Sequence, residues 1–292
     1  MFHMDLRRFV ARNWPKKIRK YLPKTIYKHL YFNGEFEFFF ENKYFGKLLN
    51  TSSEIENGIY WRGLDNGHEP KSMQIWIRLI SKFQPKRVLD IGANTGIYGV
   101  LAKMASPNSE IHFFEPSNEC NLYIEKVMSL NGYQSGFSIH NIALSDRDEL
   151  SEMFMVKTKT GVPYAYPKKN AKDALGEYRR IEISRLETLF ERLSINTFEF
   201  VKMDIEGMEP KALRGFGNLL AGEAVFLLEV LSEVNAIEIA QLFPKGRYVF
   251  YDIDDTKKVV RKQADVTKSS KWNILIVPRG FESLTDELLV DE

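Results

Sequence analysis

The chain has 292 residues, 41 of them Lys or Arg and 39 Asp or Glu, with 44% apolar residues. This composition is typical of a globular protein of one large or two small domains, and it argues against a disordered or fibrous chain. The single cysteine, Cys120, excludes an intramolecular disulfide and fits a reducing compartment. No run reaches the roughly 18 apolar residues of a membrane span, and no secretory signal is recognisable, so we expect a cytoplasmic protein.

Residues 1–65 are predicted to form a helical N-terminal extension. Residues 1–31 carry nine basic side chains against the single acid Asp5, with aromatic residues interleaved among them. Such a segment suits attraction to anionic lipid headgroups, which would place the protein peripherally at the inner membrane face. The alternative is a solvated basic extension that packs its apolar side on the body of the protein. No recognition motif accompanies the charge, so no nucleic-acid partner is expected.

Residues 66–280 are predicted to form one α/β domain in which strands and helices alternate. The predicted strands are 87–92, 110–115, 137–144, 151–156, 179–183, 198–204, 224–230, 247–253 and 272–278. The predicted helices begin at Pro70, follow the first and second strands at 95–105 and 118–130, follow a capping box at 184–187, run from Pro210 to Gly215, and run from Ser232 to Phe243. Only a polar loop separates the last two strands, so the final strand is expected to lie antiparallel in the sheet. The acidic residues 281–292 are expected to form a surface helix or a tail.

A glycine turn follows the first strand of this domain, in the pattern D-x-G-x-N-x-G from Asp90 to Gly96. Gly92 has no Cβ and would let the backbone approach a ligand closely. The second strand ends in Glu115, whose carboxylate could accept hydrogen bonds from both hydroxyls of a ribose. This layout predicts an adenosine-containing cofactor at the carboxyl ends of parallel strands. The alternative is a tight strand-to-helix turn without a ligand.

The type of cofactor follows from the residues of the turn. A diphosphate-binding turn has the pattern G-x-G-x-x-G, but Asn94 takes the place of the middle glycine here. Asp90 would repel a diphosphate and would attract an ammonium group. The pattern therefore favours S-adenosylmethionine over a nicotinamide dinucleotide.

Three acidic residues follow the fourth and fifth main strands and are expected to meet in the same crevice. Asp204 and Glu206 end the segment 200–206, and Glu229 ends the next strand. Methyl transfer to oxygen requires alignment of donor and acceptor and removal of the hydroxyl proton, which a nearby carboxylate can take. The alternative is that Asp204 and Glu206 cap the following helix. The three acids could also hold Mg²⁺ together with His68 and Glu69, although their spacing matches no dedicated metal motif.

Five segments of the chain together resemble the successive blocks of the FkbM family of S-adenosylmethionine-dependent O-methyltransferases, many of which act on sugars or polyketides. These segments are Val88–Gly96, Phe114–Pro116, Ala143–Ser145, Glu182–Leu189 and Val201–Glu209. The resemblance covers about residues 85–230. Glu187 stands where the family usually has Asp, and neither the first 60 residues nor residues 157–178 match the family, so we expect those segments to shape the acceptor site.

The resemblance implies the class I methyltransferase fold, an α/β Rossmann-like sheet of seven mostly parallel strands. The residues expected to bind the cofactor are Glu69, Asp90, Gly92, Ala93, Asn94, Gly96, Glu115, Pro116, Ala143 and Asp204. Glu206 is expected to be the general base, with Asp204 at the sulfonium and Glu229 orienting the acceptor, a glycan or glycolipid hydroxyl. A nicotinamide-dependent oxidoreductase and a non-catalytic S-adenosylmethionine-binding module remain the alternative functions.

Overall fold

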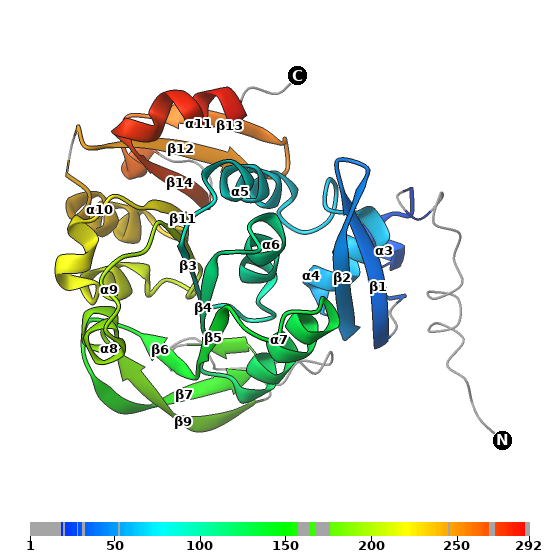
Figure 1. Ribbon diagram of the computed structural model, residues 1–292, viewed down its shortest axis with the longest axis horizontal. Coiled ribbons are helices and arrows are strands. Elements are labelled where there is room, and N and C mark those ends of the chain that lie inside the picture. The colour runs from blue at the N-terminus through cyan, green and yellow to red at the C-terminus, as the bar shows by residue number, and fades with distance from the viewer. Residues whose placement is uncertain are drawn as a thin grey trace.

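A computed structural model of the chain contains a central eight-stranded sheet that is flanked by helices on both faces (Figure 1). The residues it describes are 19, 21–27, 29–30, 33–51, 53–156, 164–166, 176–244, 246–268 and 272–289. The strands, in order across the sheet, are β13 (Val259–Gln263), β12 (Tyr248–Asp254), β14 (Asn273–Pro278), β11 (Val225–Glu229), β10 (Phe200–Met203), β3 (Arg87–Ile91), β4 (Glu110–Phe114) and β5 (Phe137–His140). The step from β3 to β10 reverses the strand order, and such a point is where α/β sheets bind ligands.

The predicted α/β class and the antiparallel last strand are confirmed, because β14 pairs antiparallel with both β11 and β12. The predicted number of seven main strands is too small by one. The segment between β12 and β14, predicted to be a polar loop, contains the edge strand β13, which pairs antiparallel with β12. Arg261 and Lys262 in β13 are exposed. Charged side chains are common on edge strands, and they removed the apolar signal on which the prediction depended.

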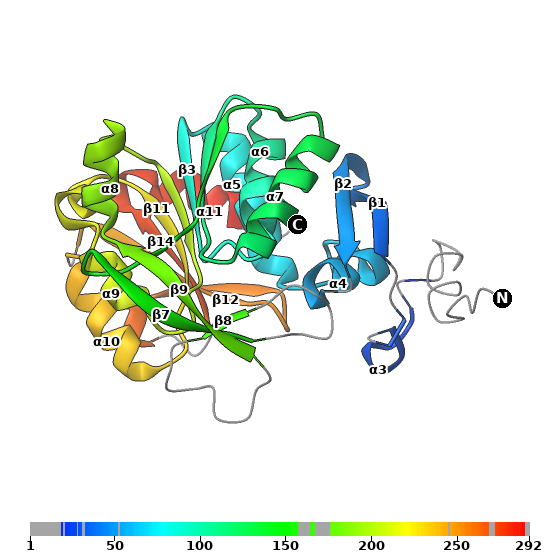
Figure 2. The same ribbon diagram turned by 90° about the horizontal axis from the view of Figure 1, so that it is seen from below.

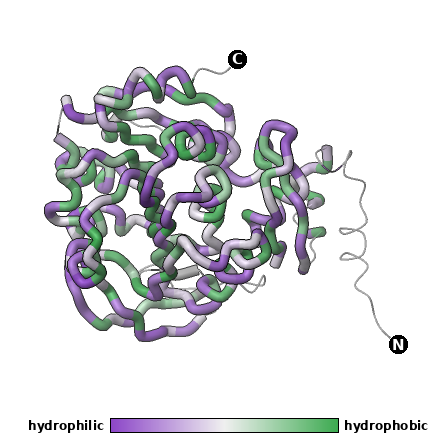
Figure 3. Tube along the Cα trace, viewed as in Figure 1, coloured by the Kyte–Doolittle hydropathy of each residue, from purple (hydrophilic) through white to green (hydrophobic). Residues whose placement is uncertain are grey.

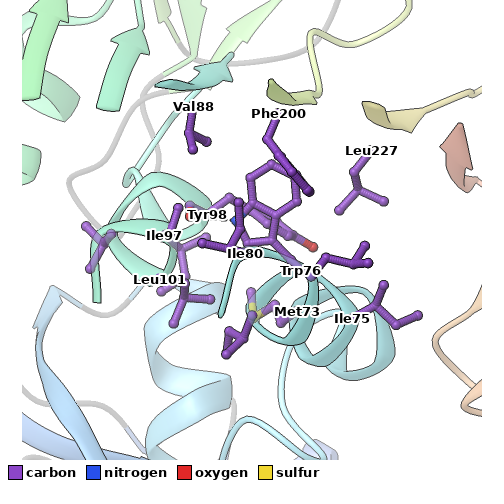
Figure 4. Packing of buried hydrophobic residues seen from close by; sticks show 14 of the residues in the cluster. Met73, Ile75, Trp76, Ile80, Val88, Ile97, Tyr98, Leu101, Phe200 and Leu227 are labelled. Atoms are coloured by element: carbon purple, nitrogen blue, oxygen red, sulfur yellow. Dashed lines mark hydrogen bonds between the residues drawn. The ribbon is translucent and has the colours of Figure 1, made fainter. Parts of the chain in front are cut away.

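Two apolar layers cover the two faces of the sheet. Helices α5 (Pro70–Phe83), α6 (Ile97–Ala105), α7 (Asn118–Leu130) and α11 (Glu282–Leu289) pack on one face, and α8 (Leu186–Leu193), α9 (Glu209–Arg214) and α10 (Glu233–Leu242) pack on the other. Apolar and polar residues alternate along these elements (Figure 3). Trp76 lies in the first layer beside Phe200 (Figure 4), with 5.9 Å between the ring centres, and its indole N–H donates to the Tyr98 carbonyl at 2.9 Å. This layer therefore packs closely against the start of β10.

A second sheet of four strands lies beside the carboxyl-terminal edge of the first (Figure 2). Its strands, in order, are β6 (Ile142–Leu144), β9 (Gly176–Ser184), β7 (Glu149–Val156) and β8 (Tyr164–Tyr166). The extra strands predicted at 151–156 and 179–183 are thus confirmed. The single strand predicted at 137–144 is wrong, because residues 137–140 form β5 in the main sheet and residues 142–144 form β6 in the second.

The predicted capping box at Ser184 and Glu187 is not formed. Ser184 is the last residue of β9, and its hydroxyl donates to Asp148 at 2.7 Å. Helix α8 begins at Leu186, and the carboxylate of Glu187 accepts from the Asn218 N–H at 2.8 Å instead of turning back to its own helix.

The helical prediction for residues 1–65 is wrong for residues 33–51, which form a β-hairpin. Its strands are β1 (Asn33–Phe40) and β2 (Lys43–Thr51), and helix α4 (Glu54–Arg62) follows them. The alternation of Glu35, Phe36, Glu37 and Phe38 has the period of a strand. Phe38 and α4 residues belong to the apolar layer that covers the main sheet. No helix among the described residues has both the length and the apolar character needed to cross a bilayer.

Candidate active site

A cavity of about 470 Å³ opens at the carboxyl ends of β3, β4, β10 and β11. It brings together residues that the sequence places more than 150 positions apart. The predicted site residues that line it are Glu69, Asp90, Gly92, Ala93, Asn94, Glu115, Pro116, Ala143, Asp204, Glu206 and Glu229. Among the predicted set, Gly96 alone lies outside this lining. It begins helix α6 with φ +70°, and a Cβ there would meet Ile124 at 2.7 Å, so its role in the structure is packing.

Gly92 lies at the floor of the cavity, where the turn after β3 meets the end of β10. Its φ is +73°, and a Cβ at this position would lie 1.9 Å from the backbone oxygen of Asp204. The Asp204 N–H in turn donates to the Ile91 carbonyl at 3.0 Å. From the sequence we expected a ligand to approach Gly92 closely. In the structure, the end of the neighbouring strand β10 approaches it. Gly92 therefore sets the distance between the β3 turn and the acids of β10.

Glu115 and Asp90 are oriented by backbone amides. The two carboxylate oxygens of Glu115 accept from the N–H groups of Asn94 and Ser117, both at 2.9 Å, and Asp90 accepts from the Gly99 N–H at 2.7 Å. Burial raises the pKa of Glu115 to about 7, against the opposing effect of its two amide donors. Burial likewise raises the pKa of Asp90 to about 7. Both side chains are held in fixed orientations, and a bound cation or a set of hydroxyl donors would favour their ionised forms.

Three acids lie at the ends of β10 and β11. Burial, followed by the charge of Asp204 and hydrogen bonding with it, raises the pKa of Glu229 well above its ordinary value. Glu206 is half-buried, and burial raises its pKa, with further contributions from Asp204 and Glu209. Carboxyl groups whose pKa is raised by burial and by neighbouring acids are a frequent feature of catalytic sites.

Neither Asp204 nor Glu206 caps helix α9, since its N-cap is Met208 and no side-chain cap hydrogen bond is formed there. Glu209 accepts from the Ile205 N–H at 2.9 Å and from the Gly207 N–H at 3.2 Å, and it thereby satisfies the amides of the loop. Glu206 lies between those two amides with φ +55°, a left-handed conformation that is costly for a residue with a side chain. The loop thus holds Glu206 at the cavity in a strained backbone conformation, while Glu209 at the start of α9 holds the loop.

Lys202 in β10 is a cavity residue that the sequence analysis missed. Its side chain is 2% exposed, and its Nζ lies 3.9 Å from Asp204 and 4.9 Å from the centre of the Tyr98 ring. Burial alone would lower the pKa of Lys202, but the carboxylates of Asp204 and Glu69 outweigh burial and raise it. The ammonium group is therefore the buried counter-charge of the acidic cavity. A lysine within an otherwise apolar central strand is rare, and that rarity was the available signal.

Glu69 lies on the opposite wall, just before helix α5. It accepts from the Tyr98 hydroxyl at 2.6 Å and from the Asn273 side-chain amide at 2.8 Å. Burial would raise its pKa, but Lys202, His68 and these two donors together lower it to about 2. Glu69 is therefore ionised throughout the physiological pH range.

The mouth of the cavity carries an exposed aromatic side chain that the sequence analysis assigned only to a strand. Trp272 lines the cavity and is 67% exposed, and Leu231, which is 38% exposed, also lines it. Within the described part of the chain, no group of three or more His, Cys, Asp or Glu side chains is placed to hold a metal ion. The Mg²⁺ alternative thus lacks a ligand set in that part.

Residues 90–250, more than half of the chain, match the model of the methyltransferase FkbM domain. No curated protein matches the chain. Solved structures with a similar fold include the O-methyltransferase from Bacillus cereus in complex with SAH, at 10% identity over 72% of this chain and 81% of that one, with a TM-score of 0.44. A SAM-dependent methyltransferase from Agrobacterium tumefaciens is similar at 11% identity, over 84% and 70% of the two chains, with a TM-score of 0.44.

Proposed function

The chain belongs to the FkbM methyltransferase domain family, and from this premise we propose that it is an S-adenosylmethionine-dependent O-methyltransferase that methylates a sugar hydroxyl of a glycan or glycolipid. The observation that carries the proposal is the acidic cavity at the switch point of the sheet, in which Glu206 has a raised pKa and faces the space beside Asp90 and Glu115. A base with a raised pKa is suited to accept a hydroxyl proton.

The residues present fit S-adenosylmethionine. Glu115, with each oxygen already aligned by a backbone amide, is suited to accept from the ribose hydroxyls. Asp90 and Asp204 offer negative charge to the amino group and the sulfonium. The same carboxylates disfavour the diphosphate of a nicotinamide dinucleotide. They thereby favour a methyltransferase over the oxidoreductase alternative.

Each acid is assigned a role from its place in the cavity and from the direction in which its pKa is shifted. When bound, S-adenosylmethionine supplies a methyl group that the sulfonium has already activated. Glu206 removes the proton of the acceptor hydroxyl as the oxygen forms its bond to the methyl carbon and the bond from that carbon to sulfur breaks. The sulfur keeps the electron pair and leaves as a neutral thioether, and the proton stays on the Glu206 carboxylate. Glu229, whose pKa is raised by burial and by Asp204, is suited to donate a hydrogen bond that orients an acceptor oxygen. The ammonium group of Lys202 offsets the negative charge of the surrounding carboxylates, which are shielded from water.

The proposal of a sugar acceptor is supported by the residues at the cavity mouth. Trp272 exposes its indole next to the acidic interior. The flat face of an exposed indole suits packing against the C–H face of a sugar ring, while the carboxyl groups inside suit its hydroxyls. An acceptor of purely apolar character would leave these carboxyl groups without partners.

The test is transfer of labelled methyl groups from S-adenosylmethionine to fractionated glycans and lipids of the source cells. We expect label in a glycan or glycolipid fraction, and none when Glu206→Gln replaces the wild type. Label that appears in protein or nucleic acid alone would contradict the proposed acceptor class. S-adenosylmethionine that binds without being consumed in any fraction would favour the non-catalytic alternative.

The N-terminal segment has two proposed roles, and the structure supports packing for part of it. Tyr27 stacks on Trp61 at 6.4 Å between ring centres, and the guanidinium of Arg19 lies 3.9 Å from the Tyr60 ring centre. Most of the basic residues of the membrane proposal lie within residues 1–18, outside the described residues. Deleting residues 1–18 separates the roles: lost sedimentation with anionic vesicles supports membrane contact, and equal recovery in the supernatant supports packing.

A further inference from the structure

A second cavity of about 430 Å³ adjoins the first, between the end of α4, the start of α5 and the turn from β12 to β13. His68 and Glu69 line both cavities, so the two share a wall. Three side chains in the second cavity are cationic or can become so, namely Arg62, His68 and Lys258. A molecule bound across the shared wall would have one part at the acids of the first cavity and another part at these cations.

The two carboxylates in the second cavity are already engaged from other directions. Asp255 accepts from the N–H and the hydroxyl of Ser72, at 2.8 and 2.6 Å, and from Asn273 at 3.2 Å. Glu69 accepts from Tyr98 and Asn273 on the side of the first cavity. Asp255 and Glu69 thereby fix the start of α5 and β14, and Glu69 also forms an ion pair with the neighbouring His68 at 3.8 Å.

The cations keep free hydrogen-bonding capacity. The Nε of Arg62 is buried and has no hydrogen-bond partner among the described residues, and another of its nitrogens donates to the Leu22 carbonyl at 3.3 Å. Lys258, with φ +56° in the turn, donates to the Asn66 side chain at 2.7 Å and can donate to two further acceptors. Arg62 and Lys258 line the same cavity, and a guanidinium together with an ammonium group suits a phosphate or a carboxylate.

We propose that the second cavity binds the anionic group, a phosphate or a carboxylate, of the acceptor whose hydroxyl is methylated in the first cavity. This deepens the proposed function and rests on it. Sugar phosphates and uronic acids both carry a hydroxyl-bearing ring next to such a group. A neutral sugar would offer no counter-charge to Arg62 and Lys258, whose hydrogen bonds to Leu22 and Asn66 are made to neutral oxygens.

The proposal is tested by calorimetry on the full-length protein at a constant ionic strength of about 0.15 M. The titrants are inorganic phosphate, glucuronate and, as the neutral control, glucose. We expect saturable binding of at least one anion and none of glucose. The variant Lys258→Met should weaken anion binding about tenfold, the effect of one charge-assisted hydrogen bond. Arg62→Met should do the same, and its midpoint of thermal unfolding shows whether it is folded.

Lys257→Met is the matched control, because Lys257 is the exposed neighbour in the same turn and does not line the cavity. We expect it to bind anions like the wild type. Absence of binding for both anions, or equal weakening in Lys257→Met and Lys258→Met, would overturn the inference.

S-adenosylmethionine is titrated into the same samples, so that failure of this inference can be told apart from failure of the proposed function. If it binds and the anions do not, this inference alone fails; if it does not bind, the proposed function fails. Binding of phosphate without glucuronate, or the reverse, identifies the source of the anionic group.

Discussion

Replacing Gly92 with alanine tests how the cavity floor is built. The added Cβ would lie 1.9 Å from the Asp204 backbone oxygen, and a contact of about 3.4 Å requires a shift of about 1.5 Å between the β3 turn and the end of β10. The positive φ of +73° adds a second penalty for any residue with a Cβ. Both effects act at the point where Asp90 and Asp204 face the same space.

The two penalties can be separated with Gly132→Ala. Gly132 has φ +81° and nothing within 4 Å of an added Cβ, so this variant reports the backbone penalty alone, about 1 kcal/mol. Gly92→Ala should lower the free energy of unfolding by about 2–5 kcal/mol, because overpacking adds about 1–3 kcal/mol or more to the same backbone term.

The assay is urea unfolding followed by tryptophan fluorescence, with S-adenosylmethionine titrated into each folded variant. We expect Gly92→Ala to lose cofactor affinity and Gly132→Ala to keep it. Equal losses of stability in the two variants would refute the close approach of Asp204. Full affinity in Gly92→Ala would show that the spacing between the two strand ends does not matter for binding.

Three further predictions concern the buried charges. Asp90→Ala and Glu115→Ala should each weaken S-adenosylmethionine binding by about 1–3 kcal/mol in calorimetry, and unchanged affinity, or tight binding of NAD, would contradict the cofactor assignment. Burial raises the pKa of Glu56 in α4 from 4.5 to about 7, so this carboxyl contributes stability that is lost as the pH rises from 5 to 8. Asp90 and Glu115 titrate in the same range, so in urea unfolding Glu56→Gln should lose up to about 3 kcal/mol less than the wild type between these two pH values; equal losses in the two proteins would reject this prediction. Lys202→Met should lower the free energy of unfolding by about 3–5 kcal/mol, because the buried acids lose their counter-charge, and a variant as stable as the wild type would show that burying the ammonium costs as much as its charge contributes.

The central strands could be predicted because their signal is local. Residues 87–91 and 225–229 are apolar runs that end at a turn or a carboxylate, as parallel strands buried on both faces do. The hairpin at 33–51 was missed although the alternation over residues 35–38 has the period of a strand. The edge strand at 259–263 was missed because its stability comes from pairing with a neighbour, and its exposed side chains weaken the periodic pattern.

The same distinction holds for the candidate site. Asp90, Glu115 and Asp204 could be predicted to line one cavity, because strand order brings the carboxyl ends of parallel strands together. The burial of Lys202 among the acids depends on side chains from several elements. The exposure of Trp272 at the mouth of the cavity also depends on several elements. Neither property follows from spacing along the chain, so both could be recognised only in the folded structure.

The most direct measurement is steady-state methyl transfer by Glu206→Gln and by the wild type, with S-adenosylmethionine affinity measured for both. The glutamine keeps the shape of the side chain and removes its basicity. We predict a decrease in turnover of about 10²- to 10⁴-fold with nearly unchanged cofactor affinity. A chelator should leave wild-type turnover unchanged. A loss of activity with the chelator would indicate that a metal ion acts in place of Glu206. Near-normal turnover of Glu206→Gln would contradict the assignment of the base and would leave alignment alone to drive the reaction.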